Sequence, residues 1–268
     1  MYCAVYPEQF GLYVRFAIVM EENIKRAAEI IRKSKHLIAL TGAGISVESG
    51  IPDFRSSGGL WEKYDPMVYA HIDSFRRSPE MVWEMIFEMV AMTKQAKPNP
   101  AHHALAELEK MGLLKAVITQ NIDNLHQEAG SVNVIEYHGN AHVLECLRCS
   151  AKYSVDEYPN DGTIPKCRSC NEILKPGVVF FGEVIPGDAL MESQMLAGSS
   201  DAILVVGTSA VVYPASNIPF IAKQNRGSVI EMNLEHTGLT GSITDVFIEG
   251  SAGITLPKLV EEVRALLQ

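Results

Sequence analysis

The sequence predicts an α/β fold in which a doubly wound parallel sheet carries a smaller second domain. Short apolar runs typical of buried strands alternate with segments in which apolar residues recur at helical spacing. Polar and glycine-rich clusters follow these runs directly, where the strands of such a sheet end. Two long segments break the alternation, and one of them contains four cysteines in two pairs. These observations predict a crevice at the strand ends and a separate, metal-stapled insertion.

The totals restrict the class of protein and its partners. The 268 residues include 47% hydrophobic and 21% charged residues, the composition of an ordinary globular protein. The formal net charge of −9 argues against stable nucleic-acid binding and favours a partner with positive charge, such as a lysine-rich protein tail. No apolar run reaches the roughly 20 residues that cross a bilayer, so no membrane partner is expected. Five cysteines without a disulfide pattern favour the cytoplasm.

The elements are expected in the following order. Residues 1–20 are an N-terminal extension without the apolar core and cleavage site of a secretion signal. A helix covers residues 21–35, where apolar residues recur at helical spacing. Buried strands are expected at residues 36–41, 116–119, 202–206, 228–233 and 245–248. Helices are expected at residues 101–111, 188–196 and 215–223, and a last helix follows Pro257 with Leu259, Val260, Val263 and Leu267 on one face.

The same alternation divides the chain into domains. The main domain is expected to comprise residues 21–54, 98–140 and 182–268, where strands and helices alternate. Residues 55–97 contain no convincing strand and are expected to form loops and helices. Residues 141–181 contain the paired cysteines. Both segments are insertions, and together they are predicted to form the small domain.

The four paired cysteines predict a structural metal site. Cys146, Cys149, Cys167 and Cys170 have the spacing C-x₂-C-x₁₇-C-x₂-C, which falls within the range of a tetrahedral zinc site. Two disulfides or an iron–sulfur cluster are the alternatives. Four thiolates leave no open coordination position, so the zinc is expected to be structural. Cys3 is expected to be a bystander.

Glycines and hydroxyl groups at two strand ends predict a nucleotide site. Gly42-Ala43-Gly44-Ile45-Ser46 follows the first strand, so its backbone amides are placed to bind a pyrophosphate. The run lacks the third glycine of the dinucleotide fingerprint and could be only a turn. Gly207-Thr208-Ser209 follows another strand and offers a second phosphate or ribose contact.

Two further clusters offer catalytic or binding groups. Gln120-Asn121-Ile122-Asp123 places two amides and a carboxylate at a strand end, where they can bind a ribose or a carboxamide. The alternative is helix capping, for which Asn and Asp are well suited. His138 follows an apolar run and is a candidate general base at neutral pH. The other histidines, including His102 and His126, are expected to be structural.

Several motifs, taken in order, resemble the sirtuin (Sir2-like) family of the archaeal and bacterial type. The resemblance covers about residues 21 to 268. It is carried by Thr41-Gly-Ala-Gly-Ile-Ser-Val-Glu-Ser-Gly-Ile-Pro-Asp-Phe-Arg55, Thr119-Gln-Asn-Ile-Asp-Asn-Leu-His126, His138-Gly139, the paired cysteines, Val178-Val-Phe-Phe-Gly-Glu183, Gly207-Thr-Ser209 with Val212-Tyr-Pro-Ala215, and Asn233. The resemblance implies a Rossmann-like doubly wound sheet with a smaller zinc-ribbon plus helical domain.

The resemblance also implies a function and assigns roles to residues. The protein would be an NAD-dependent protein-lysine deacylase that uses NAD and contains one zinc, and it would act on an acylated-lysine protein or peptide. His138 would be the general base, and Asn121 would be a second catalytic residue. Val178, Val179, Phe180 and Phe181 would pair with the substrate peptide. The residues expected to bind NAD are Gly42, Ala43, Gly44, Ser46, Asp53, Phe54, Arg55, Gln120, Asn121, Asp123, Gly207, Thr208, Ser209 and Asn233.

Two other functions are compatible with these motifs, and one stretch of the sequence bears on the preferred acyl chain. Mono-ADP-ribosyl transfer shares the step that displaces nicotinamide, and a non-enzymatic, zinc-stapled NAD-sensing module is a further class. Family members that prefer acidic acyl chains carry a Tyr/Arg pair on the helix that matches residues 79–92, and this chain has neither there. Met85, Ile86, Phe87 and Met89 are predicted to line an apolar acyl tunnel, and core packing is the more common role of such a methionine-rich stripe.

Overall fold

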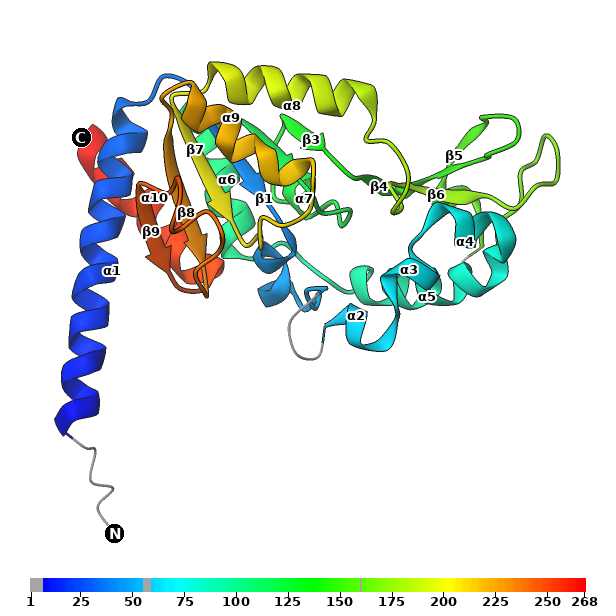
Figure 1. Cartoon of the computed structure of the whole chain (residues 1–268), viewed down its shortest axis with the longest axis horizontal. Helices are drawn as coiled ribbons and strands as arrows, with labels where there is room; N and C mark the ends of the chain where they lie inside the picture. The colour runs from blue at the N-terminus through cyan, green and yellow to red at the C-terminus, as the bar shows by residue number, and fades with distance from the viewer. Residues whose placement is uncertain (1–6, 55–58, 160) are drawn as a thin grey trace, which may run out of the picture.

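The structure, a computed structural model, describes residues 7–54, 59–159 and 161–268. Two domains lie side by side: a larger one built on a six-stranded sheet, and a smaller one with short helices and a second sheet (Figure 1). The strands of the large sheet are all parallel and lie in the order β3 (Val134–Glu136), β2 (Leu114–Thr119), β1 (Leu37–Thr41), β7 (Ala202–Val206), β8 (Ser228–Asn233) and β9 (Val246–Glu249).

The strand order confirms the predicted doubly wound sheet. From β1 the chain winds outward through β2 and β3, and from β7 it winds outward on the other side through β8 and β9. All five predicted strands are present, with bounds that differ from the prediction by at most two residues. Ligands of such sheets bind at the carboxyl ends of the strands where the winding reverses. In this chain that point lies between β1 and β7.

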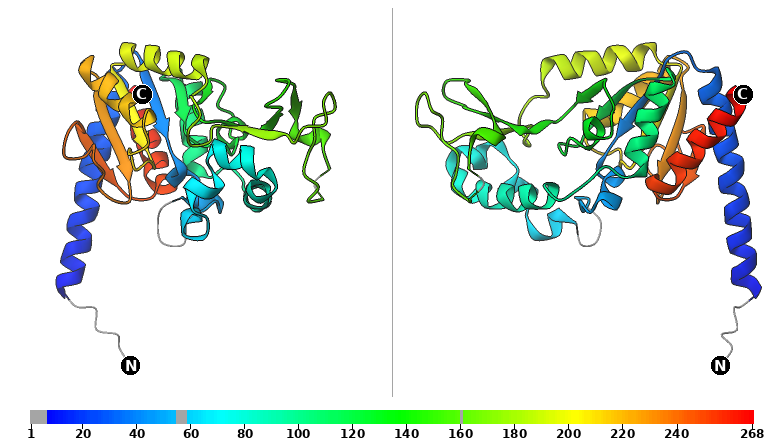
Figure 2. Two further views of the ribbon diagram at one scale, coloured as in Figure 1. Left: turned by 45° about the vertical axis from the view of Figure 1, so that its right-hand side comes forward. Right: turned by 180° about the vertical axis from the view of Figure 1, so that it is seen from behind.

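Every residue of β1 and β7 is buried, because helices cover both faces of the sheet. Alternate side chains of β1 enter different cores: Leu37 and Ala39 enter one, and Ile38 and Leu40 enter the other. The first core is closed by α1 (Pro7–Lys33), α6 (Pro100–Lys110) and α10 (Ala252–Leu267), and the second by α8 (Gly187–Ser199) and α9 (Ile218–Gln224) (Figure 2).

The two terminal helices start earlier than predicted. The first begins at Pro7 rather than at residue 21, and its first turns extend beyond the sheet domain (Figure 1). Proline is tolerated in a first turn, and the glycine at position 11 costs about 1 kcal/mol, too little to end a helix. The last helix begins at Ala252, so Pro257 lies inside it. Burial of Leu256 beside Pro257 offsets the hydrogen bond that proline cannot make, whereas Leu267 is half exposed at 51%.

Both insertions contribute to one further core. The first provides four helices, α2 (Leu60–Lys63), α3 (Pro66–Tyr69), α4 (Ile72–Arg77) and α5 (Pro79–Thr93). The second provides an antiparallel sheet in the order β5 (Lys152–Ser154), β4 (Gly139–Glu145) and β6 (Lys175–Val178). The buried members of the shared core are Ile72, Phe75, Val82, Trp83, Ile86, Leu144, Cys146, Cys167, Leu174 and Phe180. The indole N–H of Trp83 also donates to the carbonyl of Leu174 at 2.9 Å, which ties α5 to the cysteine module.

Within the described ranges, no helix has both the length and the apolar character that crossing a membrane requires.

Candidate active site

Two glycine loops meet where the winding of the sheet reverses. The N–H of Gly44, after β1, donates to the carbonyl of Gly207, after β7, at 2.8 Å. A Cβ on Gly44 would lie 2.8 Å from the main chain of Gly207, and a Cβ on Gly207 would lie 2.4 Å from the nitrogen of Ile45. Gly207 also has a φ of +60°, which favours glycine. The two loops therefore meet through their main chains, and no side chain would fit between Gly44 and Gly207.

The loops after β2, β7 and β8 are joined by hydrogen bonds through Thr208, which is buried. Its hydroxyl accepts from Gln120 Nε2 at 3.0 Å, and its carbonyl accepts from Asn233 Nδ2 at 3.0 Å. Ser209 follows as an exposed residue. The structure therefore brings the predicted NAD-contacting residues of three strand ends into one group.

Asn121 and Asp123 join this group through Ser46. The amide of Asn121 donates to the carbonyl of Gly42 at 3.2 Å and to Ser46 Oγ at 3.1 Å. The hydroxyl of Ser46 donates to Asp123 Oδ2 at 2.7 Å, while Asp123 Oδ1 accepts from the N–H of Leu125 at 3.0 Å. Asp123 therefore accepts from the first N–H of the short helix α7 (Leu125–Glu128), whose N-cap is Asn124, and holds the glycine loop in place through Ser46. These bonds are structural, and the contact of Asp123 with NAD stays a prediction.

Two histidines that were expected to be structural, His102 and His126, contact Ser46 and Thr41 beside these residues. His102 Nδ1 accepts from the N–H of Asn99 at 3.3 Å, so its Nε2 carries the proton and faces Ser46 Oγ at 3.4 Å. His126 Nε2 lies 2.9 Å from Thr41 Oγ1, and its Nδ1 is buried with no partner among the described residues. Burial lowers the pKa of His102 to about 4 and that of His126 to about 3. Both rings are therefore neutral at pH 7.

The sequence carried weak signals for this pair. His126 ends the second motif, and His102 stands at the third position of α6, where it completes a capping box with Asn99. A glutamate or glutamine is usual at that position, so the histidine was notable. Only the fold shows that the two rings lie 4.9 Å apart, edge to face.

His138 lies at the junction of the two domains, between β3 and β4. Its Nδ1 is 3.1 Å from the carbonyl of Gln120, an acceptor only, so Nδ1 carries the proton and Nε2 is left as the basic atom. Burial lowers the pKa of His138, and the hydrogen bond to Gln120 opposes that shift in part. The ring is therefore neutral at pH 7 and oriented to accept a proton at Nε2.

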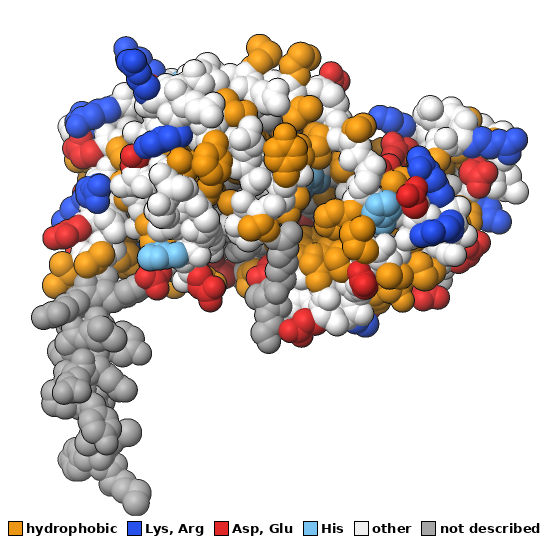
Figure 3. All heavy atoms as spheres, in the orientation of Figure 1, with side chains coloured by type: hydrophobic (Ala, Val, Ile, Leu, Met, Phe, Trp, Pro, Cys, Tyr) orange, Lys and Arg blue, Asp and Glu red, His pale blue; other side chains and the backbone are white. Residues whose placement is uncertain are grey.

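The predicted substrate run, residues 178–181, connects His138 with the helical insertion. The N–H of Val179 donates to the carbonyl of His138 at 2.8 Å. The N–H of Phe181 donates to the carbonyl of Ala70 at 2.8 Å, and the carbonyl of Phe181 accepts from the N–H of Ile72 at 3.0 Å. The run therefore lies along the boundary between the domains, where hydrophobic side chains gather on the surface (Figure 3).

An aromatic contact joins this run to the first motif. Trp61 stacks on Phe54 with a centroid distance of 5.1 Å and lies 6.4 Å from the ring of Phe181. The N–H of Trp61 also donates to the carbonyl of Phe54 at 3.0 Å. Asp53, which is predicted to bind NAD, is the residue before Phe54. Arg55, also predicted to bind NAD, lies outside the described residues. Trp61 was missed because it stands beyond the last residue of that motif.

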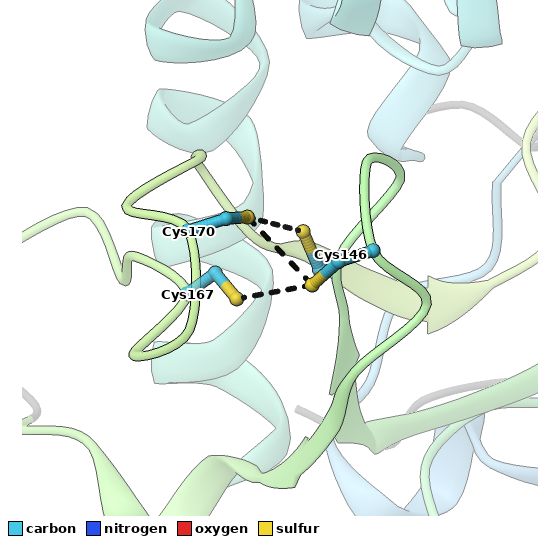
Figure 4. A group of neighbouring side chains, drawn as sticks. Cys146, Cys167 and Cys170 are labelled. Atoms are coloured by element: carbon cyan, nitrogen blue, oxygen red, sulfur yellow. Dashed lines mark hydrogen bonds between the residues drawn. The ribbon is translucent and has the colours of Figure 1, made fainter.

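The four paired cysteines form the one candidate metal cluster within the described ranges (Figure 4). All four Sγ atoms lie within 4.8 Å of one another, and three of their separations are 3.5, 3.5 and 3.6 Å. Tetrahedral zinc with Zn–S bonds of about 2.3 Å requires sulfur separations of about 3.8 Å, whereas a disulfide requires about 2.05 Å. The geometry fits zinc and excludes disulfides among these four. Cys3, the expected bystander, lies outside the described residues.

The metal cluster lies away from His138. His138 precedes the first residue of β4 and Cys146 follows its last, a separation of up to about 26 Å along an extended strand. A zinc ion there would staple the loops after β4 and before β6, and it would not touch the reacting groups.

The methionine-rich helix α5 contributes mainly to packing. Met85 is 2% exposed and Ile86 is 6% exposed, and Ile86 belongs to the core shared with the cysteine module. Phe87 and Met89 are partly buried. Neither nearby arginine supplies a cation in that core: Arg76 pairs with Asp73 at 3.2 Å, and Arg77 is exposed beside a shallow hollow of about 220 Å³.

The winding of the parallel sheet reverses at two glycine loops, and a neutral histidine with a fixed ring orientation lies beside them. This combination is typical of a dinucleotide-dependent enzyme. The sequence profile of the Sir2 family matches residues 42–214. The chain therefore belongs to the Sir2 family.

Three similar proteins support this assignment. The chain is 52% identical over 251 residues to NAD-dependent protein deacylase 2 of Archaeoglobus fulgidus, which covers 92% of this chain and 98% of that protein. A structure solved for the mechanism and regulation of Sir2 enzymes superposes with a TM-score of 0.87 at 52% identity, covering 92% of this chain and 99% of that one. Sir2Af2 bound to a myristoylated histone peptide superposes with a TM-score of 0.79 at 46% identity, covering 92% of this chain and 98% of that one.

Proposed function

We propose that this chain is an NAD-dependent protein-lysine deacylase that yields free lysine, O-acyl-ADP-ribose and nicotinamide. One observation carries the proposal. The ring Nδ1 of His138 lies 3.1 Å from the carbonyl of Gln120, which is predicted to bind NAD. The main-chain carbonyl of His138 lies 2.8 Å from the N–H of Val179, which belongs to the predicted substrate run. A base at this position serves a reaction between the two ligands. The curated relative named above is an NAD-dependent deacylase, which supports the same conclusion.

When bound, NAD would supply a ribose carbon at which the acyl oxygen of the substrate could displace nicotinamide. The loops that contain Gly42, Ala43, Gly44 and Gly207 would line the pyrophosphate site, and Thr208, Ser209 and Asn233 would hold the adenosine half. Gln120, Asn121 and Asp123 would hold the nicotinamide half, with Ser46 behind them. Asp53, Phe54 and Arg55 would close over NAD from the first motif. These assignments follow the grouping of the loops after β1, β2, β7 and β8.

His138 would act as the general base at Nε2. Its Nδ1–H is held by Gln120 O, so the ring cannot turn away without losing that bond. The lowered pKa keeps the ring unprotonated at neutral pH, so it is ready to remove a proton from a ribose hydroxyl. A positioned base of this kind contributes on the order of 10²–10⁴-fold to the rate.

The substrate would be an acylated lysine in an extended peptide that lies along Val178 to Phe181. The net charge of −9 suits a lysine-rich protein tail and disfavours nucleic acid as a partner. The acyl group would be acetyl or a longer apolar chain, because α5 provides no cation for an acidic one. A relative that binds a myristoylated peptide supports the longer chains.

Zinc would be held by Cys146, Cys149, Cys167 and Cys170 as a structural ion. The thiol-rich cluster and the absence of a disulfide pattern in the sequence favour a reducing compartment, the cytoplasm.

The test is incubation with an acetyl-lysine peptide, with and without NAD, followed by mass spectrometry. Deacetylated peptide and O-acetyl-ADP-ribose should form together, in equal amounts and only with NAD. Labelled ADP-ribose appearing on the protein without an acyl group would instead favour mono-ADP-ribosyl transfer. If neither NAD nor the acetyl-peptide is consumed, the result would contradict enzymatic activity and favour a binding module.

A further inference from the structure

Lys175, the first residue of β6, is a buried cation of the small domain that lies beside the run 178–181. Its side chain is 1% exposed. The ammonium lies 3.1 Å from Glu145 Oε1, 3.1 Å from Glu183 Oε2, and 4.8 Å from the ring centre of Phe180. A buried charge is tolerated only when it is paired and hydrogen-bonded, and two carboxylates satisfy that condition here.

The ammonium also bonds the main chain of the predicted substrate run. It donates to Pro176 O at 2.9 Å and to Val178 O at 2.7 Å. Across a trans peptide, a carbonyl and the following N–H point in opposite directions. Holding Val178 O on Lys175 therefore directs the N–H of Val179 to the other side, where it donates to His138 O at 2.8 Å. The Val178–Val179 peptide plane is fixed between the ammonium and the candidate base.

Glu183 fixes the next peptide of the same run. Its Oε2 accepts from the N–H of Phe180 at 2.8 Å, and its own N–H donates to Phe180 O at 3.0 Å. The same carboxylate is the one that pairs with Lys175. Lys175 and Glu183 therefore hold two consecutive peptides from two sides, and we call this pair the clamp.

We propose that the clamp is a positioning device for the acyl-peptide: Lys175 and Glu183 set the main-chain direction of residues 178–180 and their register against His138. This inference rests on the proposed function, because a peptide must pair with the run. Within the described residues, no hydrogen bond or ion pair joins Lys175 or Glu183 to the glycine loops, so losing the clamp should weaken peptide binding and leave NAD binding intact.

The first experiment compares Lys175→Met with the parent in steady-state deacetylation of an acetyl-lysine peptide. Methionine keeps the length of the side chain and removes the donors. The KM for peptide should rise at least tenfold, while the KM for NAD and the zinc content stay within about twofold of the parent. Lys152→Met, which removes an exposed lysine from β5 of the same small sheet, is the matched control and should behave as the parent.

A second variant decides the matter if Lys175→Met fails to fold, as two unpaired carboxylates could cause. Glu183→Ala leaves the ammonium paired with Glu145, so the fold should persist while the KM for peptide rises several-fold. Lys175→Arg restores the charge and should recover part of the peptide affinity. An equal rise in both KM values, or an unchanged peptide KM in either folded variant, would overturn the proposal.

Hydrogen exchange at the Val179 amide separates this inference from the proposed function. The amide should lose protection in Lys175→Met and keep it in Lys152→Met, whether or not the enzyme turns over. A parent without deacylation would refute the proposed function alone. Unchanged protection in Lys175→Met would refute the clamp alone.

Discussion

The buried pair His102 and His126 should make the fold sensitive to mild acid. Both rings are neutral in the folded state, with pKa values lowered by burial to about 4 and about 3. In the unfolded chain each titrates near 6.5 and takes up a proton below that pH. Stability contributed by keeping the rings neutral is therefore complete above pH 6.5. It is lost progressively as the pH falls toward 4 for His102 and toward 3 for His126.

The size of the effect follows from the two shifts. Each unit of pKa difference corresponds to about 1.4 kcal/mol, so the full loss is about 3 kcal/mol for His102 and about 5 kcal/mol for His126. At pH 5 the unfolded chain is already largely protonated and the folded one is not. Each histidine should then have reduced the free energy of unfolding by about 2 kcal/mol relative to pH 7.5.

Urea unfolding of the parent and of His126→Gln, at pH 7.5 and at pH 5, measures this contribution directly. Glutamine can still donate to Thr41 Oγ1 but cannot be protonated. The drop in unfolding free energy between the two pH values should be about 2 kcal/mol smaller in the variant, although its stability at pH 7.5 is expected to be lower. His142→Gln, which removes an exposed histidine, should show the parent's drop. Equal drops in parent and His126→Gln would refute the assignment of a buried neutral ring.

Three further predictions concern the reaction and the metal. His138→Ala should bind NAD and keep the fold but lose at least 100-fold in kcat; activity within about tenfold of the parent would refute its role as base. Elemental analysis should find one zinc per chain, and chelation should unfold the small domain and abolish activity; iron, or metal-free thiols, would contradict this. Succinyl-lysine peptide should have a kcat/KM at least tenfold below the acetyl and myristoyl versions, because its carboxylate would enter a site without a cation; equal values would exclude an apolar tunnel.

The strands could be predicted well because burial on both faces leaves a plain signal. All five residues of β1 and of β7 are buried, so each appears in the sequence as an uninterrupted apolar run. The cysteine cluster could be predicted equally well, since two C-x₂-C pairs impose their own geometry whatever surrounds them. The ends of the helices could be predicted less well. Pro257 looked like a first residue, yet tertiary packing carries α10 one and a half turns further back.

The acid-sensitive pair shows the limit of motif reasoning at the site. His126 was inside a motif and His102 was within a predicted helix, but nothing in their spacing placed the rings together. Their contact arises because α6 and α7 both approach the same strand ends. A burial-dependent property such as a lowered pKa cannot be inferred before the neighbours are known.

The sequence by itself determined the sheet, the glycine loops, the metal ligands and the candidate base, because each depends on local periodicity or on short spacings. Only the tertiary structure decided how Lys175 is used. In the sequence it is one lysine before a proline, and lysines usually lie at the surface. Folding brings Glu145 and Glu183, which lie 30 residues before it and 8 after it, to the same ammonium. The energy of a buried charge depends on such distant partners, so only the folded chain could show that this cation bonds the main chain beside His138.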